Sequence, residues 1–234
     1  MNQTQTATPT ETFDVVVIGG GPAGATAAHD LARTGRSVLL LDRAGRTKPC
    51  GGAIPPRLIK DFAIPDELLV ARATAARMIS PKDERVDIPI DNGFVGMVDR
   101  DQFDEWLRER AAASGAQRRI GDFDKITRDA DGVAVVHFEQ RSPTDKSVRL
   151  PACVRARAIV GADGAKSAVA KQAVPGAERT KYVFAYHEIL RTPAVLPAGF
   201  DPSRCDVYYR GSLSPDFYGW VFPHGDTMSV GTGS

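Results

Sequence analysis

The stretch FDVVVIGGGPAGATAAHDLARTGRSVLLLD, residues 13–42, decides the fold of this chain. Its first part, 13–18, is apolar and rich in β-branched residues, which predicts a buried parallel strand. A helix is expected over 22–33, and the apolar run 37–41 predicts a second strand that continues to Asp42. The order strand, helix, strand is typical of a nucleotide-binding domain built on a parallel sheet.

Three glycines between the first strand and the helix have the spacing G-x-G-x-x-G: Gly19, Gly21 and Gly24. Gly19 allows a tight turn, Gly21 lets a pyrophosphate approach the backbone, and Gly24 lets helix and strand pack closely. The phosphates would lie at the helix N-terminus, where unpaired N–H groups favour negative charge. Asp42 stands about 20 residues further on, where a carboxylate accepts hydrogen bonds from ribose hydroxyls. The stretch therefore predicts a dinucleotide site; the alternative is a glycine-rich structural turn.

Composition excludes several classes of function. The chain has 234 residues, of which 42% are hydrophobic and 25% charged, and its net charge of +1 gives no basis for binding nucleic acid. Three scattered cysteines, Cys50, Cys153 and Cys205, predict neither a disulfide framework nor a metal site. We therefore expect no metal and a reducing, cytoplasmic compartment. No apolar stretch reaches the length of a transmembrane helix, so any membrane contact is expected to be peripheral.

Further along the chain, the pattern changes from alternating strands and helices to β-rich segments. Helices are expected near 57–62, 65–72 and 101–116. Strands are expected at 76–80, 85–90, 94–98, 116–120, 122–128, 133–139, 148–155, 158–161, 206–209 and 220–222. This order predicts an α/β nucleotide-binding domain made of two chain segments, with a β-rich second domain between and after them.

Two further motifs are similar to those of flavoproteins with the para-hydroxybenzoate hydroxylase fold. Arg100 opens a helix directly after a strand, and the segment 157–169, RAIVGADGAKSAV, contains an apolar strand followed by Asp163 and Gly164. In that fold the two motifs lie against FAD. A surface arginine and an ordinary Asp-Gly turn are the alternative interpretations.

Two more motifs resemble the geranylgeranyl reductase family, which shares this fold. The loop 48–52, KPCGG, is similar to the Cys-Gly loop of that family, and the stretch 218–223, YGWVFP, is similar to its YxWxFP signature. An ordinary core strand is the alternative for the aromatic stretch. The resemblance covers nearly the whole chain after residue 12.

The resemblance implies an enzyme that uses FAD and NADPH to saturate three double bonds of a geranylgeranyl group, giving phytyl in chlorophyll or bacteriochlorophyll biosynthesis. The substrate would be a prenyl diphosphate or a prenylated tetrapyrrole, with peripheral contact at the photosynthetic membrane; the oligomeric state is not indicated. The implied cofactor-binding residues are Gly19, Gly21, Gly24, Asp42, Arg43, Cys50, Gly51, Arg100, Asp163 and Gly164.

An isolated alkene has no carbonyl to polarise, so the protein must hold it in a dry pocket against the flavin and supply a proton from the opposite side. The expected pocket residues are Phe217, Tyr218, Trp220 and Phe222, and the expected catalytic residues are Cys50 and Tyr218. Other candidate proton donors are Tyr208, Tyr209, His224 and an ordered water. His187 and His224 have no ligand-spaced partners, and we interpret both as structural.

The polar, Thr-rich start of the chain predicts a disordered tail over 1–12. The pattern of elements, together with the resemblance, predicts a discontinuous Rossmann-type FAD-binding domain over 13–48 and 96–172 and a β-rich (α+β) substrate domain over 49–95 and 173–234. The family needs a third FAD segment, and the Gly-Asp at 225–226 precedes a strand-like sequence instead. We therefore expect a C-terminally truncated chain that is inactive alone. The alternatives are an FAD-dependent aromatic monooxygenase of the same fold and a non-catalytic prenyl-binding protein or fragment.

Overall fold

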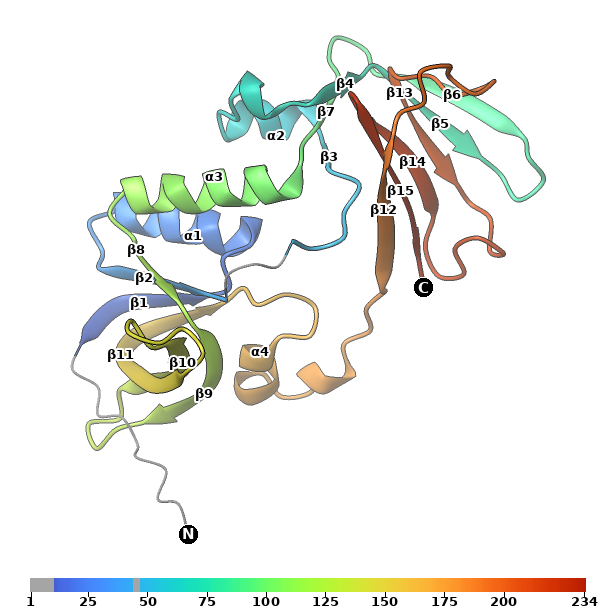
Figure 1. Cartoon of the computed structure of the whole chain (residues 1–234). Helices are drawn as coiled ribbons and strands as arrows, with labels where there is room; N and C mark the ends of the chain where they lie inside the picture. The colour runs from blue at the N-terminus through green and yellow to red at the C-terminus, as the bar shows by residue number, and fades with distance from the viewer. Residues whose placement is uncertain (1–10, 44–46) are drawn as a thin grey trace. The chain divides into compact units, whose positions relative to one another are not determined.

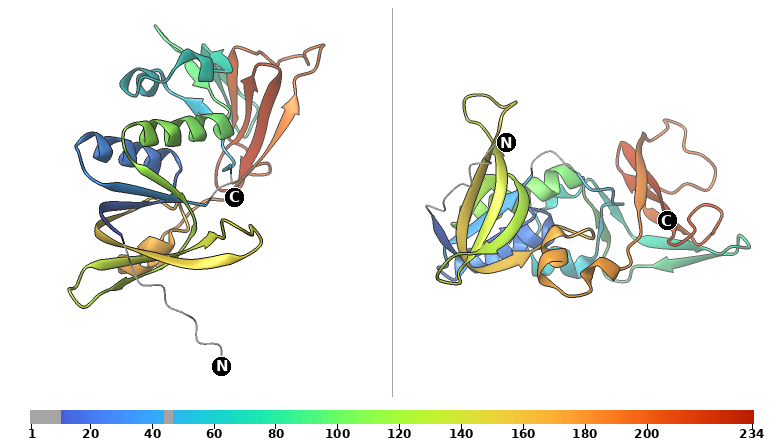
Figure 2. Two further views of the ribbon diagram at one scale, coloured as in Figure 1. Left: turned by 60° about the vertical axis from the view of Figure 1, so that its left-hand side comes forward. Right: turned by 90° about the horizontal axis from the view of Figure 1, so that it is seen from below.

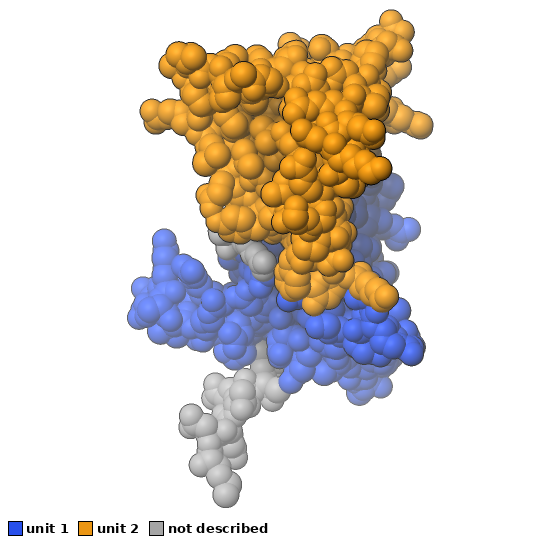
Figure 3. All heavy atoms as spheres, turned by 90° about the vertical axis from the view of Figure 1, so that its right-hand side faces the viewer, with its two compact units in different colours: residues 1–46, 104–180 blue, residues 47–103, 181–234 orange. Residues whose placement is uncertain are grey.

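The computed structural model describes residues 11–43 and 47–234 (Figure 1). The chain divides into two compact units: unit 1 contains Met1–Arg46 and Asp104–Thr180, and unit 2 contains Thr47–Phe103 and Lys181–Ser234 (Figure 3). Most of the tail predicted over 1–12 lies outside the described residues. Its last two residues are exceptions, because the Glu11 carbonyl accepts from the Arg155 N–H, and Thr12 pairs with Arg155 and begins the first strand.

Unit 1 is built on a six-stranded sheet of order β8-β2-β1-β11-β10-β9. Its strands are β1 (Thr12–Ile18), β2 (Val38–Asp42), β8 (Gln117–Ile120), β9 (Asp122–Arg128), β10 (Ala134–Arg141) and β11 (Arg149–Gly161). Its helices are α1 (Pro22–Arg33), most of α3 (Arg100–Ala113), and α4 (Ala168–Ala173). β8, β2, β1 and β11 run parallel, whereas β10 and β9 are antiparallel to their neighbours. The predicted Rossmann-type parallel sheet is confirmed.

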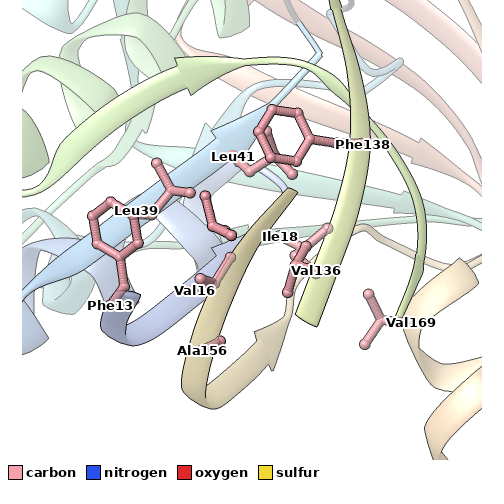
Figure 4. Close-up of a cluster of buried hydrophobic side chains, with 10 residues drawn as sticks. Phe13, Val16, Ile18, Leu39, Leu41, Val136, Phe138, Ala156 and Val169 are labelled. Carbon is pink, nitrogen blue, oxygen red and sulfur yellow. The ribbon is translucent and has the colours of Figure 1, made fainter. Parts of the chain in front are cut away.

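Both faces of the central strands β1 and β2 are buried, as their continuous apolar sequences require. On one face, buried side chains of β1, β2, β10 and β11 form one hydrophobic cluster with Val169 of α4 (Figure 4). On the other face, α1 contacts β1 and β2 through its small buried residues Ala25 and Ala28. Figure 2 shows α1 and the unit 1 part of α3 side by side on the same side of the sheet.

Two expected elements differ from the structure. The predicted strands 148–155 and 158–161 form a single strand, β11, because its first half pairs with β10 and its second half with β1. The predicted helix 65–72 is wrong. Only a short 3₁₀ turn forms at Asp66–Leu68, and the Val70 N–H donates to the Met97 carbonyl, so the chain leaves the turn as a strand.

Unit 2 contains a six-stranded sheet of order β12-β15-β14-β13-β5-β6 and a three-stranded sheet of order β3-β7-β4. The strands of the larger sheet are β5 (Ala75–Ile79), β6 (Arg85–Pro89), β12 (Ala185–Arg191), β13 (Arg204–Tyr208), β14 (Gly219–His224) and β15 (Thr227–Gly233). The smaller sheet consists of β3 (Ala53–Ile54), β4 (Ala71–Ala73) and β7 (Val95–Met97), and α2 (Pro56–Asp61) contacts β7. This unit has the β-rich character that the sequence predicts. Within the described part of the chain, no helix is both long and apolar enough to cross a membrane.

Candidate functional site

The glycine-rich loop of unit 1 connects the end of β1 to the first turn of α1. Gly19 has a φ of +105°, and a Cβ there would strike the Ala162 carbonyl, so only glycine fits. A Cβ on Gly24 would overlap the Gly19 carbonyl oxygen. In contrast, a Cβ on Gly21 would meet nothing within 4 Å. Gly19 and Gly24 therefore permit close packing, whereas Gly21 leaves open space beside the start of the helix.

The N-terminus of α1 suits an anion. Gly21 is its N-cap, Pro22 follows, no described side chain caps the helix, and its first turn contains no acidic residue. The first N–H groups of a helix have no partner within the helix, and the helix dipole makes this end positive. Together with the open space at Gly21, these features fit the phosphates of a dinucleotide.

Asp42 ends β2 beside the loop, and α3 supplies an arginine that contacts both. A Cβ on Gly20 would lie 2.8 Å from the Asp42 carboxyl group. Arg108 donates to the Gly20 carbonyl at 3.0 Å, and its guanidinium lies 3.8 Å from the Asp42 carboxylate. Arg108 and Arg118 each donate to Glu105 at 2.8 Å; burial opposes the effect, but these bonds lower the pKa of Glu105. Sequence reasoning missed Arg108, and its helical spacing from Glu105 was the available signal.

The Asp163 turn lies next to the glycine loop within unit 1, since the Ala162 N–H donates to the Ile18 carbonyl at 2.8 Å. The Asp163 carboxylate accepts hydrogen bonds at the start of α4, from Ser167 Oγ at 2.5 Å and from the Ala168 N–H at 2.6 Å. Asp163 therefore orders this helix start. Its role toward a cofactor, like that of Gly164, remains a prediction.

In unit 2, the Cys-Gly-Gly loop packs directly on the aromatic strand β14. A Cβ on Gly51 would lie 2.5 Å from the Phe222 ring and 3.3 Å from Trp220 Nε1. Side chains alternate across a strand, so residues two apart on β14 share one face. The structure therefore brings together the two motifs, far apart in the sequence, that resemble the geranylgeranyl reductase family.

The predicted pocket residues form a row of rings with increasing exposure. Trp220 and Phe222 are buried, and their ring centroids lie 6.3 Å apart. Tyr218 is half-buried, 6.2 Å from Trp220, and stacks on Phe217 at 4.0 Å. The Phe217 side chain is 45% exposed. The inner two rings therefore belong to the core of unit 2, while Tyr218 and Phe217 extend the row outward; their contact with a substrate remains a prediction.

The two predicted catalytic residues differ in their surroundings. Burial raises the pKa of Tyr218, and interactions with Tyr209 and Cys50 raise it further, so the phenol keeps its proton. The Cys50 thiol is half-buried and accepts a hydrogen bond from the Gly52 N–H at 3.4 Å. Burial raises the pKa of the Cys205 thiol to about 12, so this thiol stays protonated and inert.

The remaining predicted cofactor residues lie at the ends of elements. Arg43 follows β2 and is exposed, and Arg100 is the half-buried first residue of α3. Neither position tests the predicted role. Among residues 11–43 and 47–234, no cluster of three or more His, Cys, Asp and Glu side chains could hold a metal ion.

A dinucleotide loop on a parallel sheet, with a carboxylate at the end of the next strand, defines a nucleotide-binding protein of the Rossmann type. A family model described as an FAD binding domain matches residues 12–226, and the chain belongs to this family. It is 58% identical over 222 residues to the geranylgeranyl diphosphate reductase of Rhodobacter capsulatus, covering 95% of this chain and 54% of the relative. This likeness confirms the resemblance stated above.

Two more distant proteins show a likeness of the same kind. The chain is 38% identical to the chloroplastic geranylgeranyl diphosphate reductase of Arabidopsis thaliana, covering 94% of this chain and 48% of that protein. The crystal structure of a geranylgeranyl bacteriochlorophyll reductase-like protein from Thermoplasma acidophilum superposes with a TM-score of 0.76 at 25% identity, covering 96% of this chain and 57% of that one. The chain thus spans about half the length of the curated relatives it matches.

Replacing Asp42 by alanine is expected to weaken FAD binding about tenfold or more, because a hydrogen bond to a charged group contributes about 1.5–3 kcal/mol. Fluorescence titration of FAD would measure this change. Asp61→Ala, which removes an exposed carboxylate paired with Arg57 on α2, is the matched control and should bind FAD as the wild type does. Equal FAD affinity in the Asp42→Ala and wild-type proteins would contradict the ribose assignment.

Proposed function

We propose that the protein is a geranylgeranyl reductase, which uses FAD and NADPH to saturate the three double bonds of a geranylgeranyl group. The group would be carried on a diphosphate or esterified to a chlorophyll or bacteriochlorophyll. The observation that carries this proposal is the contact between the Cys50–Gly52 loop and the aromatic face of β14, since these two motifs distinguish the reductases from the aromatic monooxygenases of the same fold. The names of the relatives in bacteria and plants support the same substrate class.

In this proposal, each double bond takes up one hydride and one proton. Bound FAD, reduced by NADPH, would supply the hydride. The open space at Gly21, the uncapped N-terminus of α1 and the Asp42 carboxylate would hold the pyrophosphate and ribose. Phe217 and Tyr218 would contact the apolar prenyl chain and help to exclude water. Cys50 would donate the proton, with Tyr218 as the second candidate.

The location we propose follows from the substrate: cytoplasmic, with peripheral contact at the photosynthetic membrane. All three cysteines are free thiols, which suits a reducing compartment. On and before β12, unit 2 exposes several large apolar side chains: Tyr182, Val183, Phe184, Tyr186, Ile189 and Leu190. Such side chains suit contact with a pigment-bearing membrane surface.

The proposal is tested by anaerobic incubation of the full-length protein with FAD, NADPH and geranylgeranyl diphosphate. Mass spectrometry should detect products that gain two hydrogens for each saturated double bond. The same assay with geranylgeranyl-bacteriochlorophyll separates the two substrate forms. Oxygen-dependent hydroxylation of an aromatic compound, without alkene saturation, would instead support the monooxygenase alternative.

Replacing Cys50 by alanine separates proton donation from loop packing. If the thiol donates the proton, the variant should bind FAD and be reduced by NADPH at the wild-type rate, yet saturate the alkene at least 100-fold more slowly, the lower range of general acid catalysis. Stopped-flow absorbance would follow the two half-reactions separately. Cys205→Ala, which removes a buried thiol that contacts Met97, is the matched control. Normal alkene saturation by Cys50→Ala would assign the thiol to packing alone.

A further inference from the structure

We propose that His224 is a positioning residue that fixes the Cys50–Gly52 loop, and with it the Cys50 thiol, by donating two hydrogen bonds at once. This inference rests on the proposed function only in its activity measurement. His224 is the last residue of β14 and follows Trp220 and Phe222 at intervals of two residues, so it lies on the face that contacts the loop.

The His224 ring bridges two acceptors that come from different parts of unit 2. Its Nδ1 lies 3.0 Å from Asp99 Oδ1, and its Nε2 lies 2.9 Å from the Gly51 carbonyl oxygen. The ring is almost fully buried, with 3% of the side chain exposed. A carbonyl oxygen only accepts, and so does an ionised carboxylate, whereas a neutral imidazole carries a single N–H. Both bonds therefore form together when the ring carries two protons, and the Asp99 carboxylate balances its charge.

A second histidine of unit 2, His187, has a different kind of partner. Burial lowers the pKa of His187 on β12, and the His224 ring lowers it further. The His187 Nδ1 lies 3.2 Å from Ser229 Oγ. His187 therefore has a hydroxyl partner, whereas His224 has a carboxylate.

The loop has little freedom around this contact. The Val98 N–H donates to the Gly52 carbonyl at 2.9 Å, one residue before Asp99. Gly52 has a φ of +72°, and a Cβ there would strike the Val98 carbonyl and lie 2.7 Å from His224 Cε1. Gly52 also donates to the Cys50 thiol. Two contacts therefore hold the loop: the His224 ring of β14 contacts the Gly51 carbonyl, and the Val98 N–H contacts the Gly52 carbonyl.

Release of the loop can be measured without any enzyme activity, through alkylation of Cys50 by iodoacetamide in the full-length protein. Peptide mass spectrometry would report the alkylation rate of each cysteine. His224→Ala should raise the rate at Cys50 at least tenfold and leave the buried Cys153 and Cys205 unlabelled. His224→Gln, which can still donate to Gly51, should label close to the wild-type rate. If His224→Ala fails to fold, the Asp99→Asn variant carries the test.

Asp99 should act through His224. Asp99→Asn should raise Cys50 labelling, and Asp99→Asn combined with His224→Ala should label no faster than His224→Ala alone, because the two effects share one path. His137→Ala removes a ring in unit 1 whose partner is Thr127, and it should label as the wild type does. Wild-type labelling of Cys50 in His224→Ala, or a parallel rise at Cys205, would overturn the proposal.

The activity measurement then separates this role from a general loss of structure. His224→Ala should slow alkene saturation while NADPH still reduces the flavin at the wild-type rate, and His224→Gln should restore most of the lost saturation. Equal slowing of both half-reactions would overturn the proposal. If the wild type saturates no alkene, the proposed function fails while the alkylation result still decides the role of His224.

Discussion

Gly24→Val is expected to prevent stable folding of unit 1. The new Cβ would overlap the Gly19 carbonyl oxygen and lie 3.0 Å from the Ala162 Cβ, so α1 would have to move away from β1 and β11. Overpacking of this kind at a backbone contact costs more than about 4 kcal/mol, a large share of the stability of a typical domain. Thermal unfolding followed by circular dichroism would show the loss, and a melting temperature near that of the wild type would contradict it.

The matched control is Gly21→Val, three residues away in the same loop. Its Cβ would meet nothing within 4 Å, and its φ of −73° is accessible to any residue, so the melting temperature without cofactor should change little. The side chain would instead fill the space assigned to the pyrophosphate, and FAD binding should be lost. One glycine is then needed for folding and the other for the cofactor. Equal FAD affinity for Gly21→Val and the wild type would contradict the phosphate assignment.

Asp206→Ala is expected to destabilise unit 2 by about 3–5 kcal/mol, because it leaves a buried arginine without its carboxylate. Arg204 donates to Asp206 at 2.6 Å and 3.3 Å, and the two residues are 8% and 7% exposed. The only other partners that the structure gives the Arg204 side chain in the described residues are the Gly199 carbonyl and the half-exposed Asp201 carboxylate. Chemical denaturation would measure the loss.

The neighbouring pair provides the comparison. Arg77 donates to both oxygens of Asp87 at 2.6 Å and 2.7 Å, but Asp87 is half-exposed to water. Asp87→Ala should therefore cost far less than Asp206→Ala, since exposed ion pairs contribute little. Joint replacement of Arg204 and Asp206 by apolar residues of similar volume should recover most of the lost stability. Equal losses for Asp87→Ala and Asp206→Ala would contradict the argument from burial.

Local sequence signals predict the elements whose limits are set by neighbouring residues. The bounds of α1, Pro22–Arg33, agree with the prediction because Gly21 and Pro22 begin the helix and the chain leaves it through Gly35 at positive φ. The glycine loop, the parallel strands and Asp42 at the end of β2 follow from the same short stretch. Element limits set by distant partners are different: β11 is continuous because β10 and β1 share it, and Val70 is held by Met97.

The candidate site likewise combines residues that local sequence patterns predict with residues that only the fold brings together. The motifs in unit 1 and the aromatic strand of unit 2 were visible in the sequence because their spacing has a known chemical meaning. The contacts of His224 with Asp99 and Gly51 join residues that are far apart in the chain, and no short-range pattern marks them. Arg108 is an intermediate case, since its spacing from Glu105 indicates a helix pair but not its contact with Gly20. Such tertiary partners become visible only in the structure.

The interleaved order of the two units constrains how the chain can fold. β1 and β2 come from the first segment of unit 1, but their partners β11 and β8 come from its second segment, after the first segment of unit 2 has been made. The same holds for β5, whose partner β13 lies far downstream. Closing these long loops lowers the conformational entropy of the chain before the strand contacts that stabilise the fold have formed. We therefore expect slow folding. During synthesis, apolar strands of both units stay unpaired until their partner strands have been made. We therefore expect the growing chain to expose apolar surface that chaperones bind.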